Sequence, residues 1–187
     1  MKNPFNIQMY ALLIIFSFAN CQSPTNEAAT TYGIDQSKLK GQSGVKDDLS
    51  EKNILQIALS SPDHTTLVAG VQAAGLEDVL TNAGPLTVFA PTNEAFDKLP
   101  PGTLDELLKP RNKQKLANII TYHAAPGNYD ENNIKGVMGI GQAIGGKVEV
   151  IVKDGETFVN GAKVLGSVKA SNGYVHVIDA VLLPPEK

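Results

Sequence analysis

The stretch LTVFAPTNEAFDKL, residues 86–99, decides the fold of this chain. Its first part, Leu86–Phe89, is a short apolar, β-prone run between Gly84-Pro85 and Pro91, which is typical of a buried strand between two turns. Pro91 cannot donate to a sheet, so the strand must end there or lie at an edge. Thr92 then stands where a helix N-cap is expected. Helical spacing places three apolar residues on one face, namely Ala95, Phe96 and Leu99. One short stretch thus predicts a strand, a sharp corner and a helix that share a core.

The N-terminal residues predict export. An apolar run, Met9–Ala19, follows Lys2; it is too short to span a bilayer and fits the hydrophobic part of a signal peptide. Cys21 is the only cysteine and resembles the diacylated cysteine of a bacterial lipoprotein. We therefore expect residues 1–20 to be a lipoprotein-type signal peptide and Cys21 to carry the lipid anchor. The alternative is ordinary cleavage near Ala19, which leaves a free thiol.

The composition changes after the leader. Residues 21–47 are rich in small and polar residues and poor in large apolar ones, so we expect a flexible tether. Residues 48–187 are long enough for one domain with its own hydrophobic core. The formal charge of −3 becomes −4 when the leader and its Lys2 are removed. A mildly acidic surface argues against nucleic acid and against docking on anionic lipid, so the lipid anchor is the only expected membrane attachment.

The order of patterns within the domain predicts an α+β fold, with helices first and hairpins later. In the helical half, Ser50 is the expected cap of the first helix, and Thr103 with Glu106 matches the capping-box pattern of a later one. In the β half, KVEVIVK (Lys147–Lys153) alternates as a strand does. The face of this strand that we expect to be buried comprises Val148, Val150 and Val152. Three dipeptides predict tight turns between strands: Asp154-Gly155, Asn160-Gly161 and Asn172-Gly173.

Three segments resemble the fasciclin (FAS1) domain family in order and spacing. They are TVFAPTNEAF (Thr87–Phe96), NIITYH (Asn118–His123) and NGYVHVIDAVLLP (Asn172–Pro184). The resemblance extends over about Leu49–Pro185 and implies a single FAS1-like domain. It implies an α+β fold, a compact β-rich wedge of antiparallel strands with several short helices packed along it. The residues that carry the fold signature are Thr87, Phe89, Pro91, Thr92, Asn93, Phe96, His176 and Asp179.

The sequence lacks the usual signals of catalysis or metal binding. It contains no GxSxG turn, and neither a reactive-cysteine site nor an acid–base pair or phosphate loop can be named. By residue type alone, His123, His176 and Asp179 are candidate metal ligands, but neither HExxH nor His-x-His spacing supports a metal site. We therefore expect no enzymatic activity, no metal and no cofactor. We expect His64 to be a surface loop residue.

Tyr122-His123 allows two interpretations. In the first, His123 is a partly buried residue that hydrogen-bonds the backbone at a helix-to-strand corner, while Tyr122 fills the core. In the second, which the resemblance implies, the Tyr-His segment contributes to partner binding, as in animal adhesion proteins. We favour the first, because a buried polar residue normally needs only a satisfying partner. Thr92 and Asn93 are likewise expected to satisfy backbone groups, and Tyr129–Asn133 to form an exposed polar loop.

Export, a tether, one domain and the lack of a catalytic pattern together predict a non-catalytic interaction module held in the cell envelope. Its expected function is adhesion to cells, extracellular matrix or surface polysaccharide. Weak self-association is a further expectation. The expected location is the envelope, either lipid-anchored at the outer membrane or in the periplasm, or else the medium after secretion. The alternative is a periplasmic or envelope accessory protein that binds a small ligand or a partner subunit without adhesion.

Overall fold

The structure is a computed structural model that describes residues 51–82 and 84–185. The expected signal peptide (residues 1–20), the lipid-anchor residue Cys21 and the expected tether (residues 21–47) lie outside the described residues. Among the residues that are described, the structure holds no helix with the length and apolar character needed to cross a membrane.

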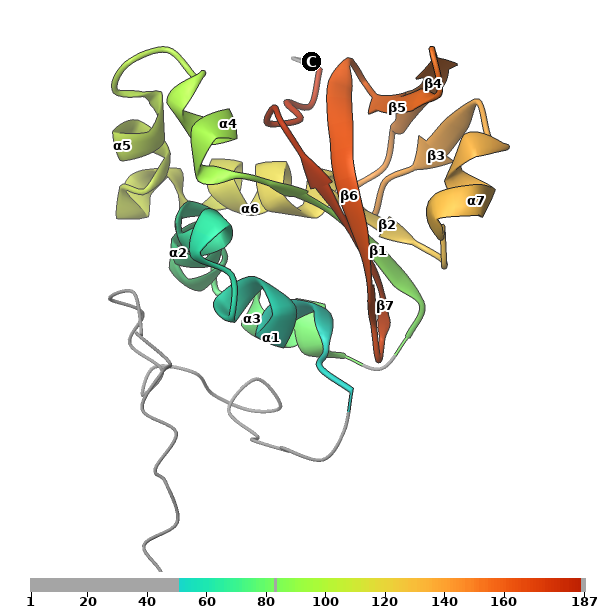
Figure 1. Cartoon of the computed structure of the whole chain (residues 1–187). Helices are drawn as coiled ribbons and strands as arrows, with labels where there is room; N and C mark the ends of the chain where they lie inside the picture. Colours follow the sequence, from blue (N-terminus) through green and yellow to red (C-terminus); the bar gives the residue numbers. More distant parts are fainter. Residues whose placement is uncertain (1–50, 83, 186–187) are drawn as a thin grey trace, which may run out of the picture. The chain divides into compact units, whose positions relative to one another are not determined.

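Helices precede most of the strands, and the expected α+β wedge is confirmed (Figure 1). The helices are α1 (Ile54–Leu59), η3 (Pro62–His64), α2 (Thr65–Ala74), α3 (Glu77–Thr81), α4 (Asn93–Asp97), α5 (Thr103–Leu107), η4 (Pro110–Asn112), α6 (Lys113–Tyr122) and α7 (Glu131–Lys135). The strands are β1 (Leu86–Pro91), β2 (Ala124–Pro126), β3 (Gly139–Gly141), β4 (Lys147–Lys153), β5 (Glu156–Val159), β6 (Ala162–Ala170) and β7 (Gly173–Ile178).

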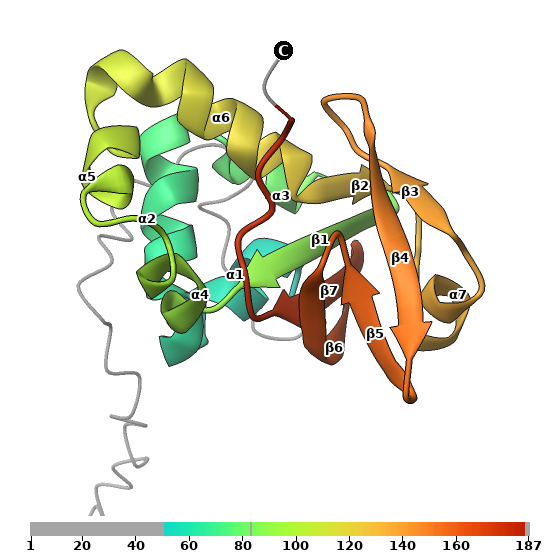
Figure 2. The ribbon, with the colours of Figure 1, turned by 90° about the horizontal axis from the view of Figure 1, so that it is seen from above.

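The strands form one sheet in the order β2-β1-β7-β6-β5-β4-β3. Its two ends come together, because the amide of Ala143, just after β3, donates to the carbonyl of Ala124 in β2 at 2.8 Å (Figure 2). Strands β1 and β7 run parallel, with Phe89 opposite His176, whereas the other neighbouring pairs run antiparallel. Among the described strands, the expected antiparallel pairing is therefore confirmed for five of the six neighbouring pairs and wrong for the central pair of β1 and β7. A parallel pair needs a long connection, which α6 and the hairpins between Pro91 and Gly173 supply.

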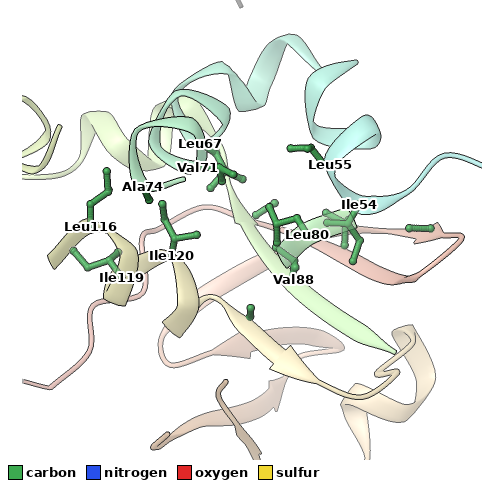
Figure 3. Close-up of a cluster of buried hydrophobic side chains, with 14 of the residues drawn as sticks. Ile54, Leu55, Leu67, Val71, Ala74, Leu80, Val88, Leu116, Ile119 and Ile120 are labelled. Carbon is green, nitrogen blue, oxygen red and sulfur yellow. The ribbon is translucent and has the colours of Figure 1, made fainter. Parts of the chain in front are cut away.

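Two hydrophobic cores lie on opposite faces of the β1–β7 pair. Successive side chains of β1 point to opposite faces, so Val88 and Ala90 enter one core while Phe89 enters the other. The helical core lies under α1, α2 and α6 (Figure 3); its members include Ile54, Leu55, Leu67, Val71, Leu80, Leu116, Ile119 and Ile120. The sheet core lies inside the curled sheet; its members include Phe89, Tyr122, Ile134, Ile140, Val148, Val159, Ile178 and Leu182. One strand thus organises both halves of the domain.

The corner after β1 has the predicted form. Strand β1 lies between β2 and β7 and ends at Pro91, and the amide of Thr92 makes the last hydrogen bond to β7, at the carbonyl of Ile178. Thr92 is the N-cap of α4, and its hydroxyl accepts a hydrogen bond from the amide of Ala95 at 3.2 Å. Phe96 packs against the helical core.

Two of the predicted helix starts are wrong. Helix α1 begins one turn later than expected, because Asn53 and Gln56 form a reciprocal capping box there and Ser50 is not its cap. Helix α5 begins at Thr103, and its N-cap is Gly102 with a φ of 80°. The Glu106 side chain does not turn back to form a box, because it pairs with basic residues that follow it in the chain.

The first two predicted hairpin turns are confirmed. Both residues of Asp154-Gly155 and of Asn160-Gly161 have positive φ, as tight hairpin turns require. The third turn is Ser171-Asn172, one residue earlier than predicted, and Gly173 is the first residue of β7. A Cβ on Gly173 would stand 1.7 Å from the carbonyl oxygen of Leu86, so only glycine lets β1 approach here.

The predicted alternation along β4 holds for most of its length. Val148 and Val150 are buried, as expected, whereas Val152 is 46% exposed, near the hairpin turn at which β4 ends.

Candidate functional site

His123 ends α6 and joins three parts of the chain. Its Nδ1–H donates to the carbonyl of Ile119 at 2.8 Å, so Nε2 is the acceptor and takes the amide hydrogen of Leu182 at 2.9 Å. Its own carbonyl accepts from the amide of Phe89. The ring is 3% exposed, and burial lowers its pKa to about 4, against which the hydrogen bond to Ile119 acts. The neutral ring of His123 therefore fastens α6 to the C-terminal segment, and its backbone carbonyl fastens α6 to β1.

Tyr122 is turned inward beside it. The side chain is 3% exposed and belongs to the sheet core, and its hydroxyl donates to the carbonyl of Lys147 at 3.5 Å. Both side chains of the Tyr-His motif are therefore buried, which is the geometry of the first of the two interpretations. A partner reaches neither side chain without opening the fold.

His176 lies at the centre of the β1–β7 pair. Its Nε2–H donates to the carbonyl of Tyr129 at 2.7 Å, and Nδ1 accepts from the hydroxyl of Ser167 at 2.7 Å. The ring is completely buried and stacks on Phe89 with the ring centres 5.7 Å apart. Burial lowers its pKa, and the hydrogen bond to Tyr129 and the charges of Glu131 and Asp130 act against that shift.

The hydroxyl of Ser167 donates to the imidazole of His176, as a catalytic serine donates to its general base. Its surroundings do not resemble those of a nucleophile, because Phe89 stacks on the imidazole and no side of His176 is open to substrate. Ser167 lies on β6, directly opposite His176 on β7. The hydrogen bond therefore ties β6 to β7 and, through His176, to the segment before α7.

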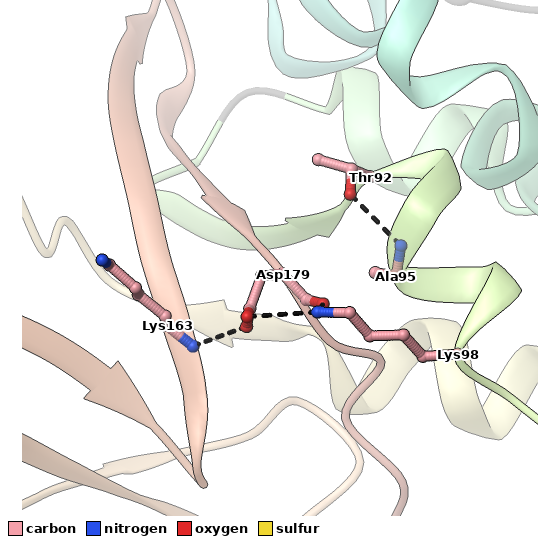
Figure 4. Close-up of polar contacts among 5 residues, drawn as sticks. All are labelled: Thr92, Ala95, Lys98, Lys163 and Asp179. Carbon is pink, nitrogen blue, oxygen red and sulfur yellow. Dashed lines mark hydrogen bonds and ion pairs between the residues drawn. The ribbon is translucent and has the colours of Figure 1, made fainter.

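Asp179 lies just after β7, and its carboxylate contacts two segments that are distant from each other in sequence (Figure 4). Its carboxylate accepts from the backbone amide of Lys163 at 2.8 Å and pairs with the Lys98 ammonium at 3.2 Å. The same ammonium donates to the carbonyl of Asp179 at 2.7 Å. Partial burial acts to raise the pKa of Asp179, but the hydrogen bond from Lys163 and the charge of Lys98 outweigh it and lower that pKa.

The polar signature residues of β1 and the corner also satisfy backbone groups. The hydroxyl of Thr87 donates to the carbonyl of Gly127 at 2.8 Å and accepts from the amide of Tyr129 at 3.0 Å. Asn93 Oδ1 accepts from the amide of Thr66 at 3.0 Å, which satisfies a free donor at the start of α2, and its amide donates to Pro62 at 2.9 Å. The side chains of Thr87 and Asn93 thus join segments that are distant in sequence.

Asn172 is a further junction that sequence reasoning took for a turn residue alone. Its Oδ1 accepts from the amide of Ile54 at 3.0 Å, which caps the start of α1. Its amide group donates to the carbonyls of Leu80 and Asn82 at 2.9 and 3.2 Å. The Asn-Gly dipeptide was the visible signal, but it is equally typical of an ordinary hairpin. Ser167 and Lys98 were missed because no local pattern marks them.

The structure does not gather His123, His176 and Asp179 into a metal site. The ring nitrogens of both histidines are engaged by protein hydrogen bonds, and Asp179 binds Lys98 and Lys163. Within residues 51–82 and 84–185 no group of three or more metal-ligating side chains is found.

Two expectations about surface loops are wrong. His64 is only 7% exposed; it ends the 3-10 turn η3 (Pro62–His64), and its Nδ1 lies 2.8 Å from the hydroxyl of Ser61. The predicted loop Tyr129–Asn133 contains the start of α7, because Asp130 caps that helix by accepting from the amides of Asn132 and Asn133.

The chain is similar to proteins of one family. The fasciclin domain model matches residues 62–184. Protein sll1483 of Synechocystis is 45% identical over 137 residues, which are 73% of this chain and 76% of that protein. Cell surface glycolipoprotein MPB83 of Mycobacterium bovis is 36% identical over 143 residues, 73% of this chain and 63% of that protein. Transforming growth factor-beta-induced protein ig-h3 of Sus scrofa is 42% identical over 120 residues, 64% of this chain and 17% of that protein.

A solved structure shares the fold. It is a FAS1 domain pair from the insect cell adhesion molecule fasciclin I, with a TM-score of 0.64. The match covers 71% of this chain and 51% of that one at 20% sequence identity.

Proposed function

Because the chain belongs to the fasciclin domain family, we propose that it is an exported, non-catalytic interaction module held in the cell envelope. Its function is adhesion to cells, extracellular matrix or surface polysaccharide. The observation that carries this proposal is that the polar signature side chains are engaged inside the fold. The bonds of His123, His176 and Asn172 go to other parts of the same chain. Recognition is therefore left to the outer surface.

The envelope location is part of the same proposal. Its support is the apolar leader Met9–Ala19 followed by Cys21, together with a relative whose name describes a cell surface glycolipoprotein. Labelling of the chain with radioactive palmitate in a bacterial host tests the anchor. Label on the natural chain that disappears in Cys21→Ala supports lipidation of Cys21, and equal labelling of the two contradicts it.

Adhesion is tested with the full chain carrying Cys21→Ser, so that no lipid contributes to binding. The protein is screened against arrays of glycans and matrix proteins and against whole cells. We expect saturable binding to at least one of these surfaces. The proposal fails if no surface retains the protein at high micromolar concentration while circular dichroism shows a folded domain.

A second function is favoured by one observation, an open depression beside α5 with a volume of 630 Å³. Sites of this size suit a small ligand, which an envelope accessory protein would bind without adhesion. The two functions are separated by thermal unfolding in the presence of soluble small molecules, because a ligand that binds only the folded state raises the midpoint. Stabilisation by a small ligand, without retention on any cell, matrix or glycan surface, favours the accessory function.

A further inference from the structure

The basic residues are unevenly distributed along this acidic chain. The segment KPRNKQK, Lys109–Lys115, holds four basic residues and no acidic one. The other 180 residues hold 12 basic and 19 acidic residues. The segment is therefore a local region of positive charge in a chain whose other residues carry a net negative charge.

The fold exposes this segment at one end of the domain. It comprises η4 and the first residues of α6, and all four of its basic residues are exposed. Figures 1 and 2 show α5, which precedes it, at the opposite end of the domain from α7. The depression of 630 Å³ lies between α5 and this segment. Its polar lining includes Thr103, Asp105, Glu106, Lys109, Asn112 and Lys115.

The charges in this region are only partly matched. Glu106 pairs with Lys109, and with Arg111 at 2.6 Å. Lys113 and Lys115 make no ion pair with any of the described residues. One carboxylate thus serves two cations, and two further cations stay available to an external anion.

We propose that Lys109–Lys115 and the adjoining depression bind an acidic polysaccharide, a chain that carries uronate carboxylates or sulfate esters. This inference rests on the proposed adhesive function and names the partner class. Anionic groups of the polysaccharide pair with Lys113 and Lys115 and compete with Glu106 for Arg111. The side chains of Thr103 and Asn112 offer hydrogen bonds to sugar hydroxyls at the same depression.

The surroundings favour a polysaccharide over an anionic membrane. Membrane-surface segments combine basic residues with large apolar side chains that enter the lipid. The large apolar side chains that are exposed in the described part of the chain all lie elsewhere, at Val79, Met138, Ile144, Ile151, Val152, Leu165, Val168 and Leu183. The depression is lined by hydroxyl, amide and ammonium groups and by the carboxylates of Asp105 and Glu106. Such a polar lining suits a hydrated sugar chain, and the anionic groups of that chain pair with the basic residues of Lys109–Lys115.

The test measures binding of the full chain carrying Cys21→Ser to immobilised alginate, a polyuronate. Neutral dextran and phosphatidylglycerol vesicles are the comparison surfaces. The variant K113E/K115E reverses the charge of the two unmatched cations, and K147E/K153E makes the same charge change on exposed lysines of β4. We expect K113E/K115E to bind alginate at least about tenfold more weakly, a change of about 1.4 kcal/mol, while K147E/K153E stays within about threefold of the parent.

Glu106→Gln gives a test in the opposite direction. Removing this carboxylate frees Lys109 and Arg111, so alginate binding should strengthen several-fold, and added salt should weaken the binding of every variant. Thermal unfolding establishes that each variant is folded.

Three results overturn the inference. One is equal weakening by the two double variants, which indicates attraction by net charge alone. Another is binding to vesicles but not to alginate, and the third is retention on a glycan or matrix protein that K113E/K115E leaves unchanged. The third result leaves the proposed adhesive function intact, whereas failure to bind any surface overturns both.

Discussion

Asn172 gives the sharpest test of how the two halves of the domain are joined. Its side chain makes three hydrogen bonds, to Ile54, Leu80 and Asn82. Ile54 and Leu80 are 1% and 5% exposed, so water cannot readily replace the bonds to their backbone groups. Asn82 lies at the end of α3, where water can replace the lost hydrogen bond to its carbonyl. Asn172→Ala therefore leaves one amide and one carbonyl unsatisfied in a buried setting, which costs about 3 kcal/mol of unfolding free energy.

The assay is urea unfolding followed by circular dichroism, with an unchanged slope as the sign that two-state unfolding persists. Asn132→Ala is the matched control, because Asn132 is exposed on α7, and it should change stability by less than about 0.5 kcal/mol. Asn172→Asp keeps the acceptor for Ile54 but turns a carboxylate toward the carbonyls of Leu80 and Asn82, so it should be at least as destabilising at pH 7. A loss in Asn172→Ala no larger than that of the control refutes this account of the junction.

Three further predictions concern the β1–β7 pair and its histidines. Gly173→Ala should lower the free energy of unfolding by about 4 kcal/mol or more, because the added Cβ would stand 1.7 Å from the carbonyl oxygen of Leu86. Gly166→Ala is the control and should be tolerated, because its Cβ would meet no atom within 4 Å. The resistance of the two variants to proteolysis tests the difference. His123 has its pKa lowered from 6.5 to about 4, so the folded state keeps the ring neutral while the unfolded chain binds a proton. Stability should therefore fall as pH drops from 6.5 to 4, by roughly 3 kcal/mol from this residue, and His123→Gln should flatten that dependence in unfolding measured across pH. Ser167→Ala should cost about 1 kcal/mol through the lost bond to His176, and hydrolysis of test esters that depends on Ser167 would contradict its structural role.

The sequence predicts well those structural features that depend only on residues adjacent in the chain. The strand before Pro91, the cap at Thr92 and the turns at Asp154-Gly155 and Asn160-Gly161 need only a few adjacent side chains, and all four are confirmed. The α+β class follows from the order of such local patterns.

What the sequence does not reveal depends on partners that are distant along the chain. The parallel pairing of β1 with β7 and the bond from Ser167 to His176 exist only once the sheet has formed. Local patterns also mislead where another nearby side chain competes, as when Glu106 pairs with Lys109 and Arg111 and leaves no capping box. The sequence does not predict the burial of His64, because burial depends on what packs over a turn.

The central claim is that the buried Tyr-His motif holds the fold, while the outer surface makes the contact with the partner. The most direct measurement compares stability and adhesion in Tyr122→Phe and His123→Gln, with binding of protein-coated beads to cells as the adhesion readout. The account predicts lower unfolding free energies with adhesion unchanged at temperatures where the variants are folded. Lost adhesion at undiminished stability would contradict it.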